Sequence, residues 1–354
     1  MYELENHHDN TGRYVFYAWG PDGPEPVEKA LRHPRTKEIT IVGPEEWEPV
    51  LLGGDRDTVD ETLKFAARKN IKLNAYYGAV MDKQLNTRYQ HIDFNIKHWP
   101  NYFGHRIAYR SKFGIYPQKP EADILKKHFV SMNGRPHWWR CMFIDKLFGK
   151  GLFDYGYISW HEFDYEDYHT LWDFEYWEPK NLEFDSDFKQ DNGMCDIFVP
   201  PKEFKNSVFS IISESNLNCL FLTEKTYMAI YHTRPFIVWG VPYTHRYLKN
   251  IGFKLFDNVI DYKFDKIEDD EKRCEMFIQQ VHDFCLIDKQ ELHKLTKDAA
   301  EYNFEVFLDH LKTKKFVPEG FEKFCIENID NHKQLLTYLE CVNSYEPLME
   351  FLKS

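Results

Sequence analysis

Residues 207–242 decide the fold, and they consist of SVFSIISESN (207–216), LFLTEKTYMAI (220–230) and RPFIVWGVP (234–242) with short connections. The first part is an apolar run that turns polar at its end, which is typical of a buried strand entering a loop. The second part has helical spacing, and the third is a short apolar run followed by Gly and Pro. Strand, loop, helix and strand in this order predict a βαβ unit, whose two strands lie parallel in one sheet.

The same alternation extends along the chain in both directions. We expect further strands at 14–18, 38–42, 72–76, 128–132, 157–160, 196–199 and around 255–256, and helices at 58–68, 136–148, 244–250 and 272–284. Because strands that alternate with helices form parallel sheets, we predict an α/β protein with two Rossmann-like lobes. The N-terminal lobe covers 1–122, the second lobe covers 123–320, and a helical tail covers 321–354. An acidic and aromatic insertion occupies 162–192.

The composition excludes several classes of protein. The 354 residues include 45 Lys and Arg against 57 Asp and Glu, and the hydrophobic content of 43% is ample for a packed core. An acidic chain is unsuited to broad nonspecific binding of nucleic acid, although a local basic cleft stays open. No apolar run reaches the ~18 residues that span a bilayer, and the N-terminus lacks the pattern of a signal peptide. We therefore expect a cytoplasmic protein without a membrane span.

The cysteines and the acidic triplets favour no metal or redox site. The seven cysteines include no Cys-x-x-Cys motif, so reduced, buried thiols are the simpler interpretation. Asp55–Asp57 and Asp185–Asp187 are Asp-x-Asp triplets, whose carboxylates suit Mn²⁺ or Mg²⁺. Acidic chains produce such triplets by chance, and no clear strand precedes Asp185. We expect no metal site.

The helix at 224–231 has an unusual first turn. Thr223 is a suitable N-cap, which places Glu224 and Lys225 at the first two helical positions. A lysine there faces the positive end of the helix dipole, at a cost of roughly 0.3–1 kcal/mol on an exposed surface. A phosphate bound between Lys225 and the backbone N–H groups would reverse the sign of this effect. Glu224 could then accept hydrogen bonds from ribose hydroxyls. A solvated helix start with a surface lysine is the alternative.

The same residues carry a resemblance to a known family. Ser-Glu-Ser-Asn at 213–216, Thr-Glu-Lys at 223–225 and Arg-Pro-Phe-Ile-Val-Trp-Gly-Val-Pro at 234–242 resemble the donor-binding motif of the α1,3-fucosyltransferase-like glycosyltransferases. In that family the Glu and Lys of Thr-Glu-Lys hold the nucleotide of the sugar donor. The resemblance therefore implies donor-binding roles for Thr223, Glu224 and Lys225, and for Ser215 and Asn216 in the preceding segment.

An upstream stretch is similar to the same family. The sequence FVSMNGRPHWWR (129–140) resembles the strand, Asn/Arg loop and Arg-bearing helix of related proteins from phages and large viruses. An arginine in this region of the family neutralises the donor diphosphate. The resemblance implies that role for Arg135 or Arg140, with Asn133 in the same donor-binding loop. A surface position on the helix is the alternative for Arg140.

The resemblance also implies a reaction. Members of the family have a two-lobed arrangement called GT-B, with the nucleotide in the second lobe and the acceptor in the cleft. They are inverting transferases that need no metal, and a UDP- or GDP-linked sugar is the co-substrate with no further cofactor. A carboxylate must deprotonate the acceptor hydroxyl, and our candidates, in order, are Asp93, Asp22 and Glu162. Each of the three also fits an ordinary surface carboxylate.

The acceptor and the function itself each have alternatives. The acceptor is a glycan or lipid-linked saccharide, or a hydroxymethylated pyrimidine in phage DNA, since the Phe-, Tyr-, Asp- and Lys-rich composition favours a viral source. Modified DNA would need a basic and aromatic groove. The residues for such a groove are Arg106, Arg110 and Lys112, near Trp99, Tyr102, Phe103 and Tyr109. A basic turn packed on core aromatics is the alternative there. The alternative function is a catalytically silent module that binds nucleotides or saccharides.

Overall fold

The computed structural model of the chain describes residues 12–17, 25–44, 56–80, 94–133, 137–159, 202–215, 217 and 219–353. The chain divides into two compact units. Unit 1 comprises Met1–Tyr109, Cys219–Leu222 and His310–Ser354, and unit 2 comprises Arg110–Asn218 and Thr223–Asp309. Each unit contains a four-stranded sheet whose neighbouring strands are parallel. The predicted α/β class and the C-terminal helical region are therefore confirmed.

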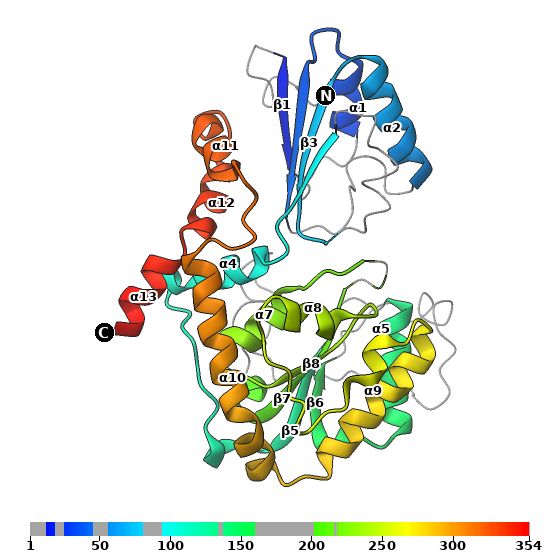
Figure 1. Cartoon of the computed structure of the whole chain (residues 1–354), viewed down its shortest axis with the longest axis vertical. Coiled ribbons are helices and arrows are strands. Elements are labelled where there is room, and N and C mark those ends of the chain that lie inside the picture. Colours follow the sequence, from blue (N-terminus) through cyan, green and yellow to red (C-terminus); the bar gives the residue numbers. More distant parts are fainter. Residues whose placement is uncertain are drawn as a thin grey trace. The chain divides into compact units, whose positions relative to one another are not determined.

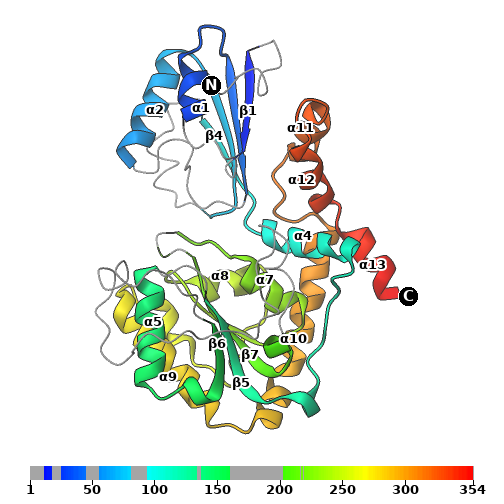
Figure 2. The same ribbon diagram turned by 180° about the vertical axis from the view of Figure 1, so that it is seen from behind.

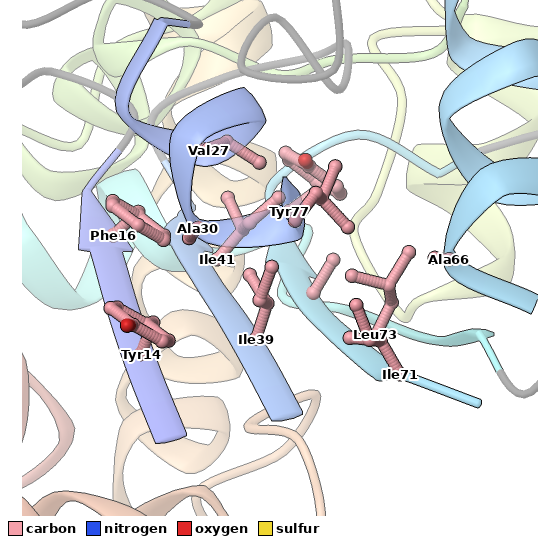
Figure 3. Packing of buried hydrophobic residues seen from close by; sticks show 12 residues of the cluster. Tyr14, Phe16, Val27, Ala30, Ile39, Ile41, Ala66, Ile71, Leu73 and Tyr77 are labelled. Carbon is pink, nitrogen blue, oxygen red and sulfur yellow. The ribbon is translucent and has the colours of Figure 1, made fainter. Parts of the chain in front are cut away.

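The sheet of unit 1 has the strand order β1-β2-β3-β4. Its strands are β1 (Arg13–Tyr17), β2 (Glu38–Gly43), β3 (Lys72–Tyr77) and β4 (Phe94–His98), and the first three alternate with α1 (Glu25–Arg32) and α2 (Arg56–Arg68). Successive side chains of a strand point to opposite faces. On one face Tyr14, Ile39 and Leu73 pack with Val27 of α1 and Ala66 of α2 (Figure 3).

Two C-terminal helices cover the other face of this sheet. Tyr17 of β1 stacks on Tyr338 of α12 (Gln334–Val342), with the ring centroids 6.4 Å apart. Tyr76 of β3 contacts Phe321 of α11 (Phe321–Asn328) at a centroid distance of 4.7 Å. Residues 321–354, which we expected to form a separate tail, are therefore part of unit 1, because their aromatic side chains complete its core.

Three rings of the basic and aromatic segment belong to the core of unit 1, whereas its Arg110 and Lys112 lie in unit 2. Trp99, Tyr102 and Phe103 are buried, and α4 (Tyr102–Tyr109) packs against α12 and α13 (Tyr345–Lys353). The Arg106 guanidinium lies over the Tyr102 ring, 5.9 Å from its centroid. Buried rings present no face on which a base could stack. For Trp99, Tyr102, Phe103 and Arg106, the structure therefore agrees with the alternative of a basic turn packed on core aromatics.

The sheet of unit 2 has the strand order β6-β5-β7-β8. Its strands are β5 (Lys127–Met132), β6 (Gly156–Ser159), β7 (Ser207–Ser213) and β8 (Phe236–Trp239). The helix α5 (Trp138–Gly149) lies between β5 and β6 in the sequence, and α7 (Glu224–Tyr231) lies between β7 and β8. Figures 1 and 2 show α5 and α9 (Asp270–Cys285) on one face of this sheet, and α7 and α10 (Lys289–Lys312) on the other. β5 and β7 are neighbours, but the connection after β5 leads to β6 on one side of the pair, whereas the connection after β7 leads to β8 on the other side.

Most predicted elements of unit 2 are confirmed. The helices at 224–231 and 244–250 (α8, Thr244–Asn250) and the strand at 236–239 have the predicted bounds. The strand predicted around 255–256 is wrong, because the backbone N–H of Phe256 donates to the Tyr262 hydroxyl at 3.2 Å and not to a sheet neighbour. The backbone of the preceding Lys254 bonds to the side-chain amide of Asn303. The strand predicted at 196–199 lies outside the described residues. Shorter elements are α6 (Lys202–Lys205) and the 3₁₀ turns Arg110–Phe113, Ala122–Ile124, Phe153–Tyr155 and Tyr262–Lys266.

His232, the residue after α7, is a buried histidine in unit 2. Its Nδ1 accepts the backbone N–H of Gln118 at 3.0 Å. Burial, and to a smaller extent the positive charges of Arg234 and Lys205, lowers the pKa of His232 to about 3. The folded chain therefore leaves this ring unprotonated at a pH where an unfolded histidine, with a pKa of about 6.5, takes up a proton.

We expect His232 to make the protein less stable in mild acid. Between the two pKa values the unfolded chain binds the extra proton, so the free energy of unfolding falls by about 2 kcal/mol between pH 7 and pH 5. His232→Asn keeps an acceptor for Gln118 and has no titrating ring. Urea unfolding at the two pH values should show that the free energy of unfolding of this variant falls by about 2 kcal/mol less than that of wild type. An equal fall in both proteins would contradict the prediction.

No helix within the described ranges is long and apolar enough to cross a membrane.

Candidate functional site

The carboxyl ends of β5 and β7 form the natural ligand position of unit 2. In an open parallel sheet, ligands bind beyond the carboxyl ends of neighbouring strands whose connections run in opposite directions. β5 is followed by Asn133, and β7 ends at Ser213 and is followed by Glu214. All three residues are 2% exposed or less. Polar side chains that are buried at this point of the sheet define the candidate site.

Glu214 ties together four elements around this point. Its backbone N–H donates to the Trp239 carbonyl of β8 at 3.0 Å, and its carbonyl accepts the Trp139 Nε1–H of α5 at 3.2 Å. Its carboxylate accepts the Thr223 backbone N–H at 3.2 and 3.3 Å and the Thr226 hydroxyl at 2.7 Å. Glu214 therefore fixes the first turn of α7 against the ends of β7 and β8 and the start of α5.

The environment of Glu214 changes its acidity. Burial, the largest effect, raises the pKa of the carboxyl group. The hydrogen bonds from Thr223 and Thr226 and the charge of Lys225 oppose this effect without cancelling it. The Thr223 N–H and the Thr226 hydroxyl both donate to the carboxylate, which is the arrangement that suits its ionised form. A carboxylate that is costly to bury is thus retained at the centre of the candidate site.

The first turn of α7 has the predicted cap. Thr223 is the N-cap residue, and its hydroxyl accepts the backbone N–H of Lys225 at 3.4 Å. The Lys225 ammonium lies 3.3 Å from a carboxylate oxygen of Glu224, and the two side chains are 14% and 17% exposed. The lysine is therefore held beside the helix N-terminus by the carboxylate of Glu224. An anionic ligand would compete with this carboxylate for the Lys225 ammonium.

The start of α5 lies at the same point of the sheet. His137 is its N-cap residue and makes no side-chain cap bond, and the first turn contains no acidic residue. Arg140 is only 3% exposed, and its Nη2 donates to the Ser213 carbonyl at 3.3 Å. Because Glu214 bonds to Trp139 of α5 and to Thr223 at the start of α7, the first turns of both helices are attached to the end of β7. Their dipoles make this region favourable for an anion.

Asn133 lies between β5 and β6 at this edge. Its backbone N–H donates to Ser159 Oγ at 2.9 Å, and its side-chain amide donates to Ser131 Oγ at 3.0 Å. Asn133 Oδ1 and Ser213 Oγ are both buried, and neither has a hydrogen-bond partner in the described parts of the chain. Buried polar atoms in native proteins are nearly always paired. A ligand or ordered water at the site would supply a partner for both atoms.

The loop after β8 is held rigidly next to the site. Arg273 of α9 donates from Nε to the Gly240 carbonyl at 3.1 Å. His245 Nε2 accepts the Val238 N–H at 3.1 Å, so its proton is on Nδ1, which donates to Asp265 at 2.9 Å. Burial alone would raise the pKa of Asp265, but the hydrogen bonds that it accepts from His245 and Arg246 lower it. The Asp265 carboxylate also accepts the backbone N–H groups of His245 and Arg246, which fixes the start of α8.

The structure brings together five of the predicted site residues and leaves others undescribed. Asn133, Arg140, Thr223, Glu224 and Lys225 lie around the ends of β5 and β7, as given above. Ser215 is half-buried in the loop after β7. The predicted residues outside the described ranges are Asp22, Asp93, Glu162, Arg135 and Asn216.

Sequence reasoning gave no specific role to Glu214 or Trp139. The signal for Glu214 was a carboxylate placed directly after an apolar strand, nine residues before Thr223 and twelve before Thr226. No group of three or more His, Cys, Asp or Glu side chains in the described part of the structure is arranged to hold a metal ion. The Asp55–Asp57 and Asp185–Asp187 side chains lie outside that part.

Comparison of the chain with models of protein families, with curated proteins and with solved structures found no match.

Proposed function

We propose that the protein is an inverting glycosyltransferase that takes its sugar from a nucleotide-sugar donor bound at the ends of β5 and β7. The observation that carries the proposal is the attachment of two helix N-termini, one of them carrying Lys225, to Glu214 at the point of a parallel sheet where nucleotides bind. The resemblance of 213–242 and 129–140 to fucosyltransferase-like enzymes supports the same assignment. The two-lobed GT-B arrangement is part of the proposal.

The described residues have distinct tasks in this proposal. The donor phosphates lie against the N–H groups that start α7, and the Lys225 ammonium moves from Glu224 to the phosphate, where it neutralises the leaving diphosphate. Glu224, released from this ion pair, accepts hydrogen bonds from the ribose hydroxyls. Arg140 is buried and bonded to the Ser213 carbonyl, so it acts by fixing the end of β7 and by its charge.

The acceptor side of the reaction rests on residues outside the described ranges. Asp93, Asp22 and Glu162 remain the candidates for the base that deprotonates the acceptor hydroxyl. Protein cations meet the need for charge neutralisation, so the proposed reaction is independent of metal. We favour a saccharide acceptor over modified DNA, because Trp99, Tyr102 and Phe103 are in the core of unit 1.

We expect one nucleoside diphosphate to stabilise the protein against heat, and Lys225→Ala to remove most of this effect. Ligand at 100 times its Kd adds about 2.7 kcal/mol, which raises the melting temperature by about 2–4 °C per kcal/mol for a chain of this size. The measurement is a thermal-shift screen of UDP, GDP, CDP, ADP and their sugar conjugates with and without EDTA. Loss of a charge-assisted hydrogen bond should weaken binding roughly 10- to 100-fold.

The matched control is Lys249→Ala, which removes an exposed lysine from the last turn of α8 in the same unit. This variant should keep the full thermal shift. A flat screen for wild type, or an equal shift in Lys225→Ala, would overturn the proposal. A shift without any sugar transfer or donor hydrolysis would instead identify a binding module without catalysis.

A further inference from the structure

Three aromatic side chains stand at the start of α5, beside the candidate site. His137, Trp138 and Trp139 are each half-buried, whereas Arg140 and the four residues after it are buried. The His137 and Trp139 rings are stacked, with centroids 4.5 Å apart and planes inclined by 11°. The Trp138 ring is perpendicular to Trp139, with centroids 5.7 Å apart. The three rings restrain one another, so the orientation of the stacked pair is set before a ligand arrives.

The stacked His137–Trp139 pair is also anchored at its edge. The Nε1–H of Trp139 donates to the Glu214 carbonyl at 3.2 Å, and the carboxylate of Glu214 accepts the Thr223 N–H at the start of α7. A single buried residue therefore separates the aromatic pair from the turn that carries Lys225. Asn133 Oδ1 and Ser213 Oγ, which have no hydrogen-bond partner among the described residues, lie at the strand ends on the same edge of the sheet.

We propose that the His137–Trp139 pair is the surface on which the base of the nucleotide stacks. This inference rests on the proposed function, because a phosphate at the start of α7 would lie near Glu214, whose carbonyl accepts the Trp139 Nε1–H. A stacked, half-buried aromatic pair suits a planar base, and ordering it costs little entropy on binding. Every base has a π-face, so the pair supplies affinity for the nucleoside and leaves the choice among bases to other contacts.

The test compares a ligand with a base and a ligand without one. Calorimetry would measure the Kd of inorganic pyrophosphate and of the nucleoside diphosphate identified in the thermal-shift screen, for wild type and for His137→Ala, Trp139→Leu and Trp139→Phe. We expect His137→Ala and Trp139→Leu to raise the Kd of the nucleoside diphosphate about tenfold, which is in the range of the free energy of one base–aromatic stack. Pyrophosphate should keep its wild-type Kd within about twofold, because it has no base to stack.

Trp139→Phe separates stacking from the hydrogen bond to Glu214. Phenylalanine keeps a ring face but has no Nε1–H, so this variant should retain most of the affinity for the nucleoside diphosphate. The matched control, Phe148→Leu, changes a partly exposed ring at the opposite end of α5 and should leave both Kd values unchanged. His137→Ala decides the question if Trp139→Leu fails to fold, because the His137 side chain makes no cap bond to α5.

Several outcomes would overturn the inference. If His137→Ala and Trp139→Leu raise the Kd of both ligands by the same factor, the pair only maintains the structure of the site and does not stack on the base. An unchanged Kd for the nucleoside diphosphate would show that the base lies elsewhere. Wild-type protein that binds neither ligand would overturn the proposed function as well, and this result is seen before any variant is made.

Discussion

Glu214→Ala should lower the free energy of unfolding by about 3 kcal/mol and abolish nucleotide binding. The substitution leaves the Thr223 N–H and the Thr226 hydroxyl buried without an acceptor, and each such loss costs about 1–3 kcal/mol. The first turn of α7 then loses its attachment to β7, and Lys225 is no longer held at the end of the sheet. Urea unfolding measures the first effect, and calorimetry with the identified nucleoside diphosphate measures the second.

Glu214→Gln is the matched control for this prediction. Its side-chain oxygen still accepts hydrogen bonds from the Thr223 N–H and the Thr226 hydroxyl. We therefore expect the free energy of unfolding to fall by less than about 1 kcal/mol. The sign of the pH effect provides a further check. Because the folded pKa of Glu214 is raised, the folded state binds the proton more readily than the unfolded state, and the cost of burying the charge is relieved as the pH falls. The Gln variant should lack this relief, and equal losses in the Ala and Gln variants would refute the role of the carboxylate.

Gly156→Ala should destabilise unit 2 by about 3 kcal/mol or more. Gly156 starts β6 opposite Phe129 of β5, and a Cβ at this position would approach the Phe129 ring at 2.0 Å. Phe129 is completely buried, so its ring cannot move aside without disturbing the packed core. The chain needs glycine here for space, since the backbone of Gly156 has an ordinary extended conformation. Chemical denaturation of the variant measures the loss.

Two further variants test the reason for this loss. Gly151 has a left-handed φ of +71°, and no atom of the described residues lies within 4 Å of the place that a Cβ would occupy. Gly151→Ala should therefore cost only about 1 kcal/mol of backbone strain. Phe129→Leu in the Gly156→Ala background should recover part of the stability, because the smaller side chain makes room for the methyl group. A double variant that is no more stable than Gly156→Ala would show that the ring is not the obstacle.

The sequence was sufficient to predict the alternation of strands and helices in unit 2. Short apolar runs bounded by Gly, Pro and polar residues marked β7 and β8, and Thr223 marked the start of α7. The helix α10 was not predicted, because its buried side carries Thr296 and Asn303, which interrupt the apolar stripe. The strand predicted near 255 failed for a related reason, since Asn303 supplies the hydrogen bonds that a sheet neighbour would otherwise make.

The candidate site was predictable only where a local signal existed. The Thr-Glu-Lys turn identified Lys225, because an N-cap and a lysine in the first turn are adjacent in sequence. The burial of Glu214 depends on contacts with Trp139, 75 positions earlier, and with Thr223 and Thr226, which follow it after a loop. The packing of the C-terminal helices on the sheet of unit 1 could not be predicted either. An amphipathic pattern shows that a helix has an apolar face, but not which sheet that face will cover.

The use of residues 310–354 to complete unit 1 has a consequence for the order of folding during synthesis. About 200 residues separate Tyr109 from His310, so the first sheet leaves the ribosome long before the helices that cover Tyr17 and Tyr76. At 5–20 residues per second this interval is roughly 10–40 s. Unit 2, which ends at Asp309, can bury its core first. The nascent chain must therefore keep one apolar face of the N-terminal sheet from aggregating until residues 310–354 have been synthesised.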